Sequence, residues 1–246
     1  MLFTQAYRST IMGRREYKVF LRYIEERGYQ RGDTRLFTSC LQMEETEVFA
    51  EDPQLLAAFY DPYFEVNGKI ERLMEVIRSY ELINRIYDLF YQYDLISYNR
   101  EQFFRNFQRS WFEFFKRSYL RGGRTSGFRH VYCGDVGDSK IGGLHNWMRF
   151  YYLEIRGNIT NLSVARVHPH KKNIVSLRYR YDQVPKEFGT IYFGLQRAFE
   201  MTAMYVAFLR NKNAVYTIGL DRTPVKIQSW GVSWDPSLIA SVYFLG

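Results

Sequence analysis

The pattern of hydrophobic and polar positions changes about halfway along the chain. In the first half, hydrophobic side chains recur every three or four positions, at Ile70, Leu73, Ile77, Tyr80, Ile83, Ile86, Phe90 and Tyr93. This spacing predicts one amphipathic helix, or two in line on a drifting face. A further helix is expected to begin at Ser97 or Asn99, both of which can cap a helix. Its buried face would carry Phe104, Phe107, Trp111 and Phe115.

After about residue 121 the period becomes two. Val175, Leu177, Tyr179 and Tyr181 alternate with Ser176, Arg178 and Arg180, which is typical of a strand with one solvated face. Further strands are expected at 190–193, 214–220, 225–230 and 239–245, with a helix at 195–209 between them. We therefore predict an α+β fold, in which a mainly helical N-terminal region (1–120) precedes a mainly antiparallel β-sheet region with interspersed helices (121–246). The two regions form one continuous domain, because no linker separates them.

Composition narrows the class of protein. With 46% hydrophobic and 18% aromatic residues, the chain is too apolar for a disordered tail. A net charge of +8 favours a polyanionic partner, although ordinary solubilising charge would produce the same balance. Cys40 and Cys133 indicate neither a disulfide framework nor a zinc site. We see no signal peptide and no membrane-spanning run, and so expect a cytoplasmic or nuclear location with no membrane contact.

Two of the four histidines lie close together in the sequence, within the segment "GFRHVYCGDVGDSKIGGLHNW". Phe128, His130 and Tyr132 alternate with polar or smaller residues, which predicts a strand that carries His130 on one face. A turn at Gly137-Asp138 would then form a hairpin and bring His145 to the same cleft. Histidine suits acid and base catalysis because its ordinary pKa is about 6.5. The residues alone leave this interpretation about even with a simpler one, in which each histidine is a hydrogen-bonded group near the core.

Three motifs resemble those of one enzyme family. "GFRHVYCGD" and "GGLHNW" are similar to the two histidine motifs of the EndoU family of poly(U)-specific or uridylate-specific endoribonucleases. "KEFGTIYFGLQRAFEMTAMY", from Lys186, is similar to the lysine motif of the family and the helix that follows it. The three motifs occur in the family's order, and the resemblance extends from about residue 70 to the end of the chain.

The resemblance implies a uridine-preferring endoribonuclease that acts on single-stranded RNA, with no obligate protein partner. Members of the family cut RNA by attack of the ribose 2′-hydroxyl on the adjacent phosphate, which leaves a 2′,3′-cyclic phosphate and a 5′-hydroxyl; such an enzyme is formally a lyase. The resemblance assigns His145 as the base, His130 as the acid and Lys186 as the electrostatic stabiliser. Two alternatives share the motifs: a catalytically silent RNA-binding relative and an EndoU-type toxin domain.

The same resemblance suggests residues for binding. Thr190 stands where the family has a serine that bonds uracil, and "ASVYFLG" places Ser241 and Tyr243 beside the base. Tyr243 could instead pack in the core. We assign Arg129, Gly143 and Asn146 to the RNA-binding surface as well, and expect nearby basic residues such as Arg117 and Arg124 to contact phosphate.

Metal dependence is the point at which the chain departs from the family. Arg129 and Asp135 replace two glutamates that are associated with manganese stimulation in animal members. The chemistry requires no cofactor, because side chains supply acid, base and cation. Manganese remains possible as an activator, with Asp135 as its candidate ligand.

Overall fold

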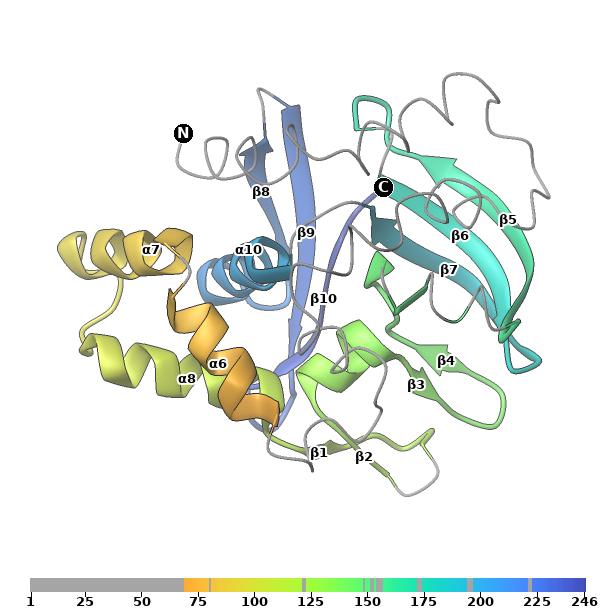
Figure 1. Cartoon of the computed structure of the whole chain (residues 1–246), viewed down its shortest axis with the longest axis horizontal. Coiled ribbons are helices and arrows are strands. Elements are labelled where there is room, and N and C mark those ends of the chain that lie inside the picture. The colour runs from red at the N-terminus through yellow and green to blue at the C-terminus, as the bar shows by residue number, and fades with distance from the viewer. Residues whose placement is uncertain are drawn as a thin grey trace.

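A computed structural model describes residues 69–79, 81–120, 123–147, 149–150, 153, 157–171, 174–193, 197–220 and 223–246. In Figure 1, helices α6, α7 and α8 lie at one side of the molecule and the sheet β5-β6-β7 at the other. The sheet β8-β9-β10 and helix α10 stand between them. The fold is α+β, as predicted. The helices expected before residue 69, and Cys40, lie outside the described residues.

The helices begin where the sequence predicts. The repeat between residues 70 and 93 forms two helices, α6 (Lys69–Ser79) and α7 (Glu81–Gln92). Helix α8 (Arg100–Phe112) starts after Asn99, whose side chain accepts a hydrogen bond from the Gln102 backbone N–H at 2.9 Å. It ends earlier than expected, since Phe115 already belongs to the short strand β1 (Phe115–Lys116). Helix α10 (Arg197–Arg210) packs its apolar side on the central sheet.

Two three-stranded antiparallel sheets form most of the β structure. One sheet has the order β5 (Ile159–Val167), β6 (Ile174–Tyr181), β7 (Val184–Tyr192), and the other has the order β10 (Ile239–Phe244), β9 (Thr223–Gly231), β8 (Val215–Leu220). Two small hairpins complete the described strands: β1 with β2 (Arg124–Thr125), and β3 (Asp135–Val136) with β4 (Ile141–Gly142). The five strands predicted after residue 174 are all present, although β7 begins at Val184, six residues before its expected start.

The structure corrects three details of the sequence analysis. Residues 129–133 form the π-helical turn η4 (Arg129–Cys133) instead of a strand. Strand β5 was not predicted, because bulges and the positive φ of Asn161 (53°) break its alternation. Strand β6 has no fully solvated face: Ser176, expected to be exposed, is buried where β6 runs between β5 and β7.

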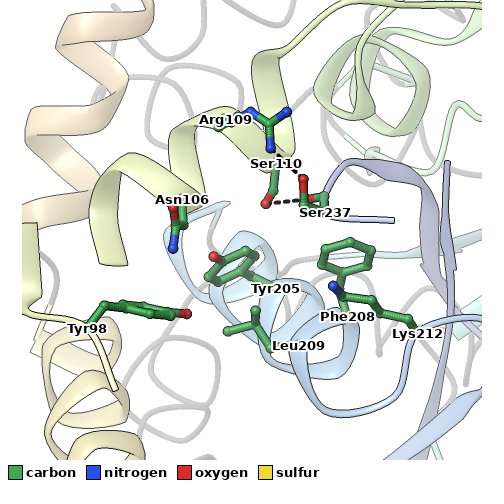
Figure 2. Close-up of a pocket in the computed structure, with 9 residues that line it drawn as sticks. All are labelled: Tyr98, Asn106, Arg109, Ser110, Tyr205, Phe208, Leu209, Lys212 and Ser237. Carbon is green, nitrogen blue, oxygen red and sulfur yellow. Dashed lines mark hydrogen bonds between the residues drawn. The ribbon is translucent and has the colours of Figure 1, made fainter. Parts of the chain in front are cut away.

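Two hydrophobic clusters form the core around the two histidine segments. The larger joins α6, α7, α8, η4, α10 and the β8-β9-β10 sheet, and the smaller joins the β5-β6-β7 sheet to residues 141–153. Separately, a cavity of about 170 Å³ lies between α8, α10 and the loop that precedes β10 (Figure 2). Among the helices that the structure describes, none has the length and apolar character needed to cross a membrane.

Candidate active site

His130 lies in the π-helical turn η4 and is only 6% exposed. The turn closes with a hydrogen bond from the Gly134 N–H to the Arg129 carbonyl, the i to i+5 spacing of a π-helix. Phe128, Val131 and Tyr132 around it are fully buried. Packing on all sides explains why the apolar residues in this segment resemble a buried strand when only the sequence is considered.

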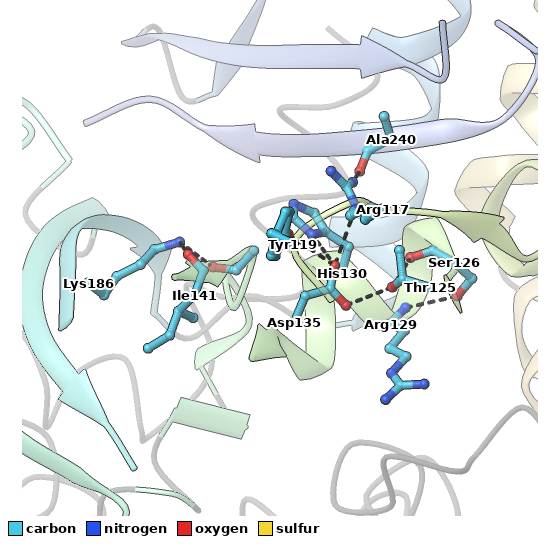
Figure 3. Close-up of polar contacts among 11 residues, drawn as sticks. Arg117, Tyr119, Thr125, Ser126, Arg129, His130, Asp135, Ile141, Lys186 and Ala240 are labelled. Atoms are coloured by element: carbon cyan, nitrogen blue, oxygen red, sulfur yellow. Dashed lines mark hydrogen bonds and ion pairs between the residues drawn. The ribbon is translucent and has the colours of Figure 1, made fainter. Parts of the chain in front are cut away.

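The carboxylate of Asp135 holds the His130 ring. His130 Nδ1 lies 2.6 Å from Asp135 Oδ2, while Asp135 Oδ1 accepts a hydrogen bond from the Thr125 hydroxyl at 2.7 Å (Figure 3). The Arg117 Nε lies 3.4 Å from Asp135 Oδ2, and its guanidinium also donates to the Ala240 carbonyl of β10. Burial would raise the pKa of Asp135, but His130, Thr125 and Arg117 together hold it below its usual value. Asp135 is therefore a buried carboxylate.

Burial and the carboxylate act on His130 in opposite directions. Burial lowers the pKa of His130, and the contact with Asp135 offsets this only in part. Since Nδ1 faces a carboxylate, we assign a proton to Nδ1. Nε2 is then the ring nitrogen that can exchange a proton with a substrate. The aspartate stabilises the doubly protonated ring whenever Nε2 is protonated, which is what a general acid requires.

Two glycines allow the β3-β4 hairpin to lie directly against His130. A Cβ on Gly142 would lie 2.8 Å from His130 Cε1 and 2.0 Å from the Tyr119 hydroxyl oxygen. At Gly143, φ is +64° and a Cβ would lie 1.7 Å from the His130 carbonyl oxygen. Leu144 N–H and His145 N–H then donate to the carbonyls of His130 and Val131. The turn at Gly137 predicted from the sequence is present, and these backbone contacts hold the two histidine segments side by side.

His145 is oriented by β7 and β10. Its Nδ1 lies 2.8 Å from the Thr190 carbonyl oxygen, so that Nδ1 must donate and Nε2 is left as a free acceptor. The ring stacks on Tyr243 of β10, with centroids 4.6 Å apart and planes 10° apart. Burial, with a smaller contribution from the Lys186 ammonium, lowers the pKa of His145 to about 3, although the bond to Thr190 acts the other way. His145 is therefore neutral at physiological pH.

Lys186 projects from β7 toward the same place. Its Nζ donates to the carbonyls of Ile141, at 3.1 Å, and Gly143, at 3.0 Å (Figure 3). An ammonium has three N–H donors, so one is left for another acceptor. Burial and the neighbouring Lys140 lower the pKa of Lys186 to about 8, against a small opposite effect of Asp135. Near pH 7 the lysine is mostly charged.

The residues assigned to uridine lie on the strands beside His145. The Thr190 hydroxyl lies 2.9 Å from that of Ser176 on the neighbouring strand β6. Ser241 and Tyr243 stand two residues apart on β10, and therefore face the same side of the sheet. Both are partly exposed. Tyr243 is thus not a fully buried core tyrosine. One face of its ring covers the His145 ring, so only the rest of the ring is open to another group.

Arg129 and Asn146 lie differently from these residues. The guanidinium of Arg129 points away from the contact between His130 and Asp135 (Figure 3). Asn146 is 0% exposed: its amide N–H donates to Glu200 at 3.3 Å and its Oδ1 accepts from the Arg149 N–H at 3.0 Å. These contacts tie the segment after His145 to α10, so the observed role of Asn146 is to hold that segment.

Asp135 does not fit the expectation of a manganese ligand. Its oxygens are already bonded to His130 and Thr125, and the Arg117 guanidinium lies 3.4 Å away, where it would repel a cation. The part of the chain that the structure describes has no group of three or more His, Cys, Asp or Glu side chains arranged to hold a metal ion.

Several residues of the site are not recognisable from the sequence. Arg117 was expected to contact RNA phosphate, but its guanidinium forms an ion pair with Asp135 and donates a hydrogen bond to the Ala240 carbonyl. Thr125 and Ser176 showed no signal at all, because each reaches its partner only through the tertiary fold. Tyr119, beside Asp135, is a further example; burial and that carboxylate raise its pKa to about 12.

Comparison with known proteins finds relatives among the endoribonucleases. Uridylate-specific endoribonuclease from Bos taurus is 26% identical over 167 residues, 67% of this chain and 39% of the bovine protein. Its counterpart from Homo sapiens is 27% identical over 141 residues, 56% of this chain and 34% of the human protein. The chain thus spans less than half the length of these two relatives.

The fold agrees with this relationship. The solved structure of XendoU, described as a splicing-independent snoRNA-processing endoribonuclease, superposes with a TM-score of 0.58 and 19% identity, and covers 73% of this chain and 67% of that one. Residues 65–244 match the sequence pattern of the family "Endoribonuclease XendoU", a span that contains both histidines, Lys186 and Tyr243. The chain is a member of the Endoribonuclease XendoU family, that is, of the EndoU endoribonucleases.

Proposed function

We propose that this protein is a uridine-preferring endoribonuclease that cleaves single-stranded RNA by transphosphorylation. The observation that carries the proposal is the pair of opposite histidine environments: His145 donates from Nδ1 to a carbonyl, whereas His130 contacts a carboxylate. The first arrangement leaves a neutral acceptor nitrogen, and the second stabilises a protonated ring. A base and an acid are the two groups that this reaction needs.

In the proposed reaction, His145 Nε2 takes the proton of the ribose 2′-hydroxyl as its oxygen attacks the adjacent phosphorus. The bond from phosphorus to the 5′-oxygen breaks, and His130 gives its Nε2 proton to that oxygen. The products are a 2′,3′-cyclic phosphate and a 5′-hydroxyl, with the proton transferred from one histidine to the other. Lys186 uses its remaining N–H to stabilise the extra charge on the phosphorane, as an oriented cation does in other phosphoryl transfers.

Uridine preference is proposed to reside on β7 and β10. The Thr190 hydroxyl can bond the edge of the base, and Ser241 lies on the same face of β10 as Tyr243. The exposed part of the Tyr243 ring offers an aromatic contact for an unpaired base. Arg129 contacts phosphate outside the reacting pair, consistent with the direction of its side chain (Figure 3). Any stimulation by manganese is proposed to involve ligands other than Asp135.

The test is cleavage of a fluorogenic oligonucleotide that contains one ribouridine. His130→Ala, His145→Ala and Lys186→Ala should each reduce the rate by at least about 100-fold, because the three groups act as one unit. Binding of an uncleavable analogue should persist in all three variants. A catalytically silent RNA-binding relative would give the opposite pattern, with binding and no cleavage even in the unmodified protein. Normal cleavage by His145→Ala would refute the assignment of the base.

A further inference from the structure

A bulge in β7 directs the side chains of Lys186 and Thr190 to opposite sides of the β5-β6-β7 sheet. Gly189 pairs with Leu177 of β6, whereas Lys186 pairs with Tyr179, so β7 advances three residues where β6 advances two. Lys186 therefore lies on the side of Tyr179, which belongs to the smaller hydrophobic cluster. Thr190 follows Gly189 directly and faces the other side.

The side of the sheet that carries Thr190 also carries arginines and an aromatic ring. Ser176, whose hydroxyl lies 2.9 Å from that of Thr190, precedes Arg178 by two residues on β6, so both side chains point to this side. The Arg178 guanidinium carbon lies 5.2 Å from the centroid of the Phe188 ring, so Phe188 lies there as well. Arg166 of β5 pairs directly with Ser176. We call this side the arginine face and define it by Arg166, Arg178, Arg180 and Phe188.

The arginine face adjoins the residue assigned to the uracil edge. Phe188 and Thr190 stand two residues, about 7 Å, apart on β7, the edge strand next to β4 and β10 (Figure 1). The chain after β10 reaches the same side, since a Cβ on Gly246 would lie 2.9 Å from Ser176 Oγ. Phe188 is 59% exposed although its side chain is large and apolar. Unpaired RNA bases stack on aromatic rings and on guanidinium planes, and Phe188 offers both with its neighbour.

The charge of this sheet favours a polyanion. Its three strands carry one carboxylate, that of Glu187, and four cations, Arg166, Arg178, Arg180 and Lys186. Arg166 is exposed and Arg178 is partly exposed. The Nε of Arg178 has no hydrogen-bond partner among the described residues. Arginine binds phosphate through paired N–H donors, so these side chains suit a phosphate backbone.

The polarity of the RNA strand follows from the two sides of β7. In the proposed reaction His130 protonates the 5′-oxygen of the nucleotide that follows the uridine. His130 lies directly against Gly142 of the β3-β4 hairpin, and Lys186 donates to carbonyls of the same segment. The following nucleotide thus belongs to the Lys186 side of β7. The nucleotide that precedes the uridine is then directed past Thr190 toward Phe188.

From these contacts we infer that the arginine face binds single-stranded RNA on the 5′ side of the cleaved uridine. The preceding base stacks on Phe188, and phosphates of this part of the strand contact Arg178 and Arg166. The inference rests on the proposed function, because a uridine beside Thr190 sets the position of the strand. It adds a binding surface outside the cleft that holds the two histidines.

Fluorescence anisotropy with labelled RNA tests the inference without cleavage when deoxyuridine replaces the single uridine. Lengthening a short strand at its 5′ side should tighten binding. Phe188→Ala should weaken binding of the 5′-extended strand by on the order of 10-fold, because one base stack is lost. Phe188→Trp keeps an aromatic ring and should bind as tightly as the unmodified protein. The matched control, Tyr93→Ala, changes an aromatic residue that is 67% exposed after α7, at the other side of the molecule (Figure 1), and should have no effect.

An abasic nucleotide directly 5′ of the deoxyuridine separates stacking from a structural role of the ring. With no base to stack, Phe188→Ala and the unmodified protein should bind this strand equally. A variant that had damaged the sheet would remain weaker than the unmodified protein on both strands, and that result would contradict the stacking contact.

Arg178→Gln tests the phosphate contact. The slope of log Kd against log salt concentration for the 5′-extended strand should decrease by about 0.7, the value for one phosphate of a single strand. Arg178→Lys keeps the charge and should keep the slope. The control is Arg105→Gln, which removes an exposed arginine of α8 and should leave affinity and slope unchanged.

The inference is overturned if Phe188→Ala and Arg178→Gln bind the 5′-extended strand as tightly as the unmodified protein, the result expected if the face served an acidic protein instead. It is also overturned if their defect appears only when the strand is lengthened at its 3′ side. The nuclease is tested separately. A protein that binds 5′-extended RNA through Phe188 but cuts no RNA would refute the nuclease and leave the arginine face standing, whereas cleavage with no dependence on the 5′ strand would refute only the face.

Discussion

The imidazole of His145 lies flat against the phenol ring of Tyr243, with centroids 4.6 Å apart and planes 10° apart. The stack joins the proposed base to β10, the strand on which Ser241 and Tyr243 are proposed to bind uridine. On its other side His145 is held by the Thr190 carbonyl, so two strands from different sheets fix one ring. Any change at Tyr243 should therefore affect the chemical step as well as the binding of the base.

The first prediction follows from this stack. Tyr243→Phe keeps the ring and should retain most of the turnover, whereas Tyr243→Ala frees one face of His145 and should reduce kcat by about 10-fold or more. The measurement is kcat and KM for the single-ribouridine oligonucleotide. If Tyr243→Ala raised KM and left kcat unchanged, the tyrosine would contact only the base.

The second prediction concerns pH. His130 must be protonated to act as the acid, and burial lowers its pKa, so the active form is lost as pH rises through that lowered value. Lys186 loses its charge near pH 8, whereas His145 stays neutral above about pH 3. The value of kcat/KM should therefore fall in two steps as pH rises, the first below the ordinary histidine pKa of about 6.5 and the second near pH 8.

Asp135→Asn provides the check on that profile. The carboxylate of Asp135 raises the pKa of His130, so its removal should start the decline at lower pH and reduce the rate at neutral pH. Activity that instead increases as pH rises toward neutrality would mean that neutral His130 is the working form, and the two histidine roles would have to be exchanged.

The third prediction addresses base choice. Thr190→Val keeps the shape and removes the hydroxyl, and should reduce discrimination for uridine over cytidine by about 1 to 3 kcal/mol. Ser176→Ala should act in the same direction with a smaller effect, because Ser176 orients that hydroxyl. Ser229→Ala is the control, since this buried serine bonds the Asn211 carbonyl instead. Unchanged relative rates on single-uridine and single-cytidine substrates would remove Thr190 from the site.

The fourth prediction concerns metal. Side chains supply acid, base and cation, and Asp135 is bonded to His130 and Thr125, so cleavage should persist in excess EDTA with at most modest stimulation by manganese. Arg129→Glu should increase the response to manganese and weaken RNA binding; the charge-matched control is Arg105→Glu on α8, which is exposed. Complete loss of cleavage in EDTA, restored by manganese at unchanged RNA affinity, would contradict this view.

Much of the fold was predictable because the spacing of hydrophobic residues and the capping of helices depend only on neighbouring residues in the sequence. Asn99 caps α8 as expected, and the alternation at Val175 and Leu177 marks β6. The failures have local causes too. His130 lies in a π-helical turn whose apolar neighbours are buried on all sides, so their alternation carried no information about a strand. Asn161 breaks the period of β5 with its positive φ.

The candidate site was predictable only as far as motifs extend. His130, His145, Lys186 and Thr190 are each identifiable from a short segment, and the contacts through Gly142 and Gly143 bring both histidine segments together. The residues that tune them are not identifiable, since Arg117 reaches Asp135 and Ser176 reaches Thr190 across separate strands or loops. A single sequence contains no signal for such pairs, because the contacts depend on strand register and packing.

The fifth prediction, and the most direct test, is the identity of the ends produced from an oligonucleotide with one ribouridine. The proposed reaction uses the ribose 2′-hydroxyl as the nucleophile, so mass spectrometry should find a 2′,3′-cyclic phosphate on one fragment and a 5′-hydroxyl on the other. The same oligonucleotide with deoxyuridine at that position should remain intact while still competing for binding. Cleavage of the deoxyuridine substrate, or fragments that carry a 5′-phosphate, would contradict the account.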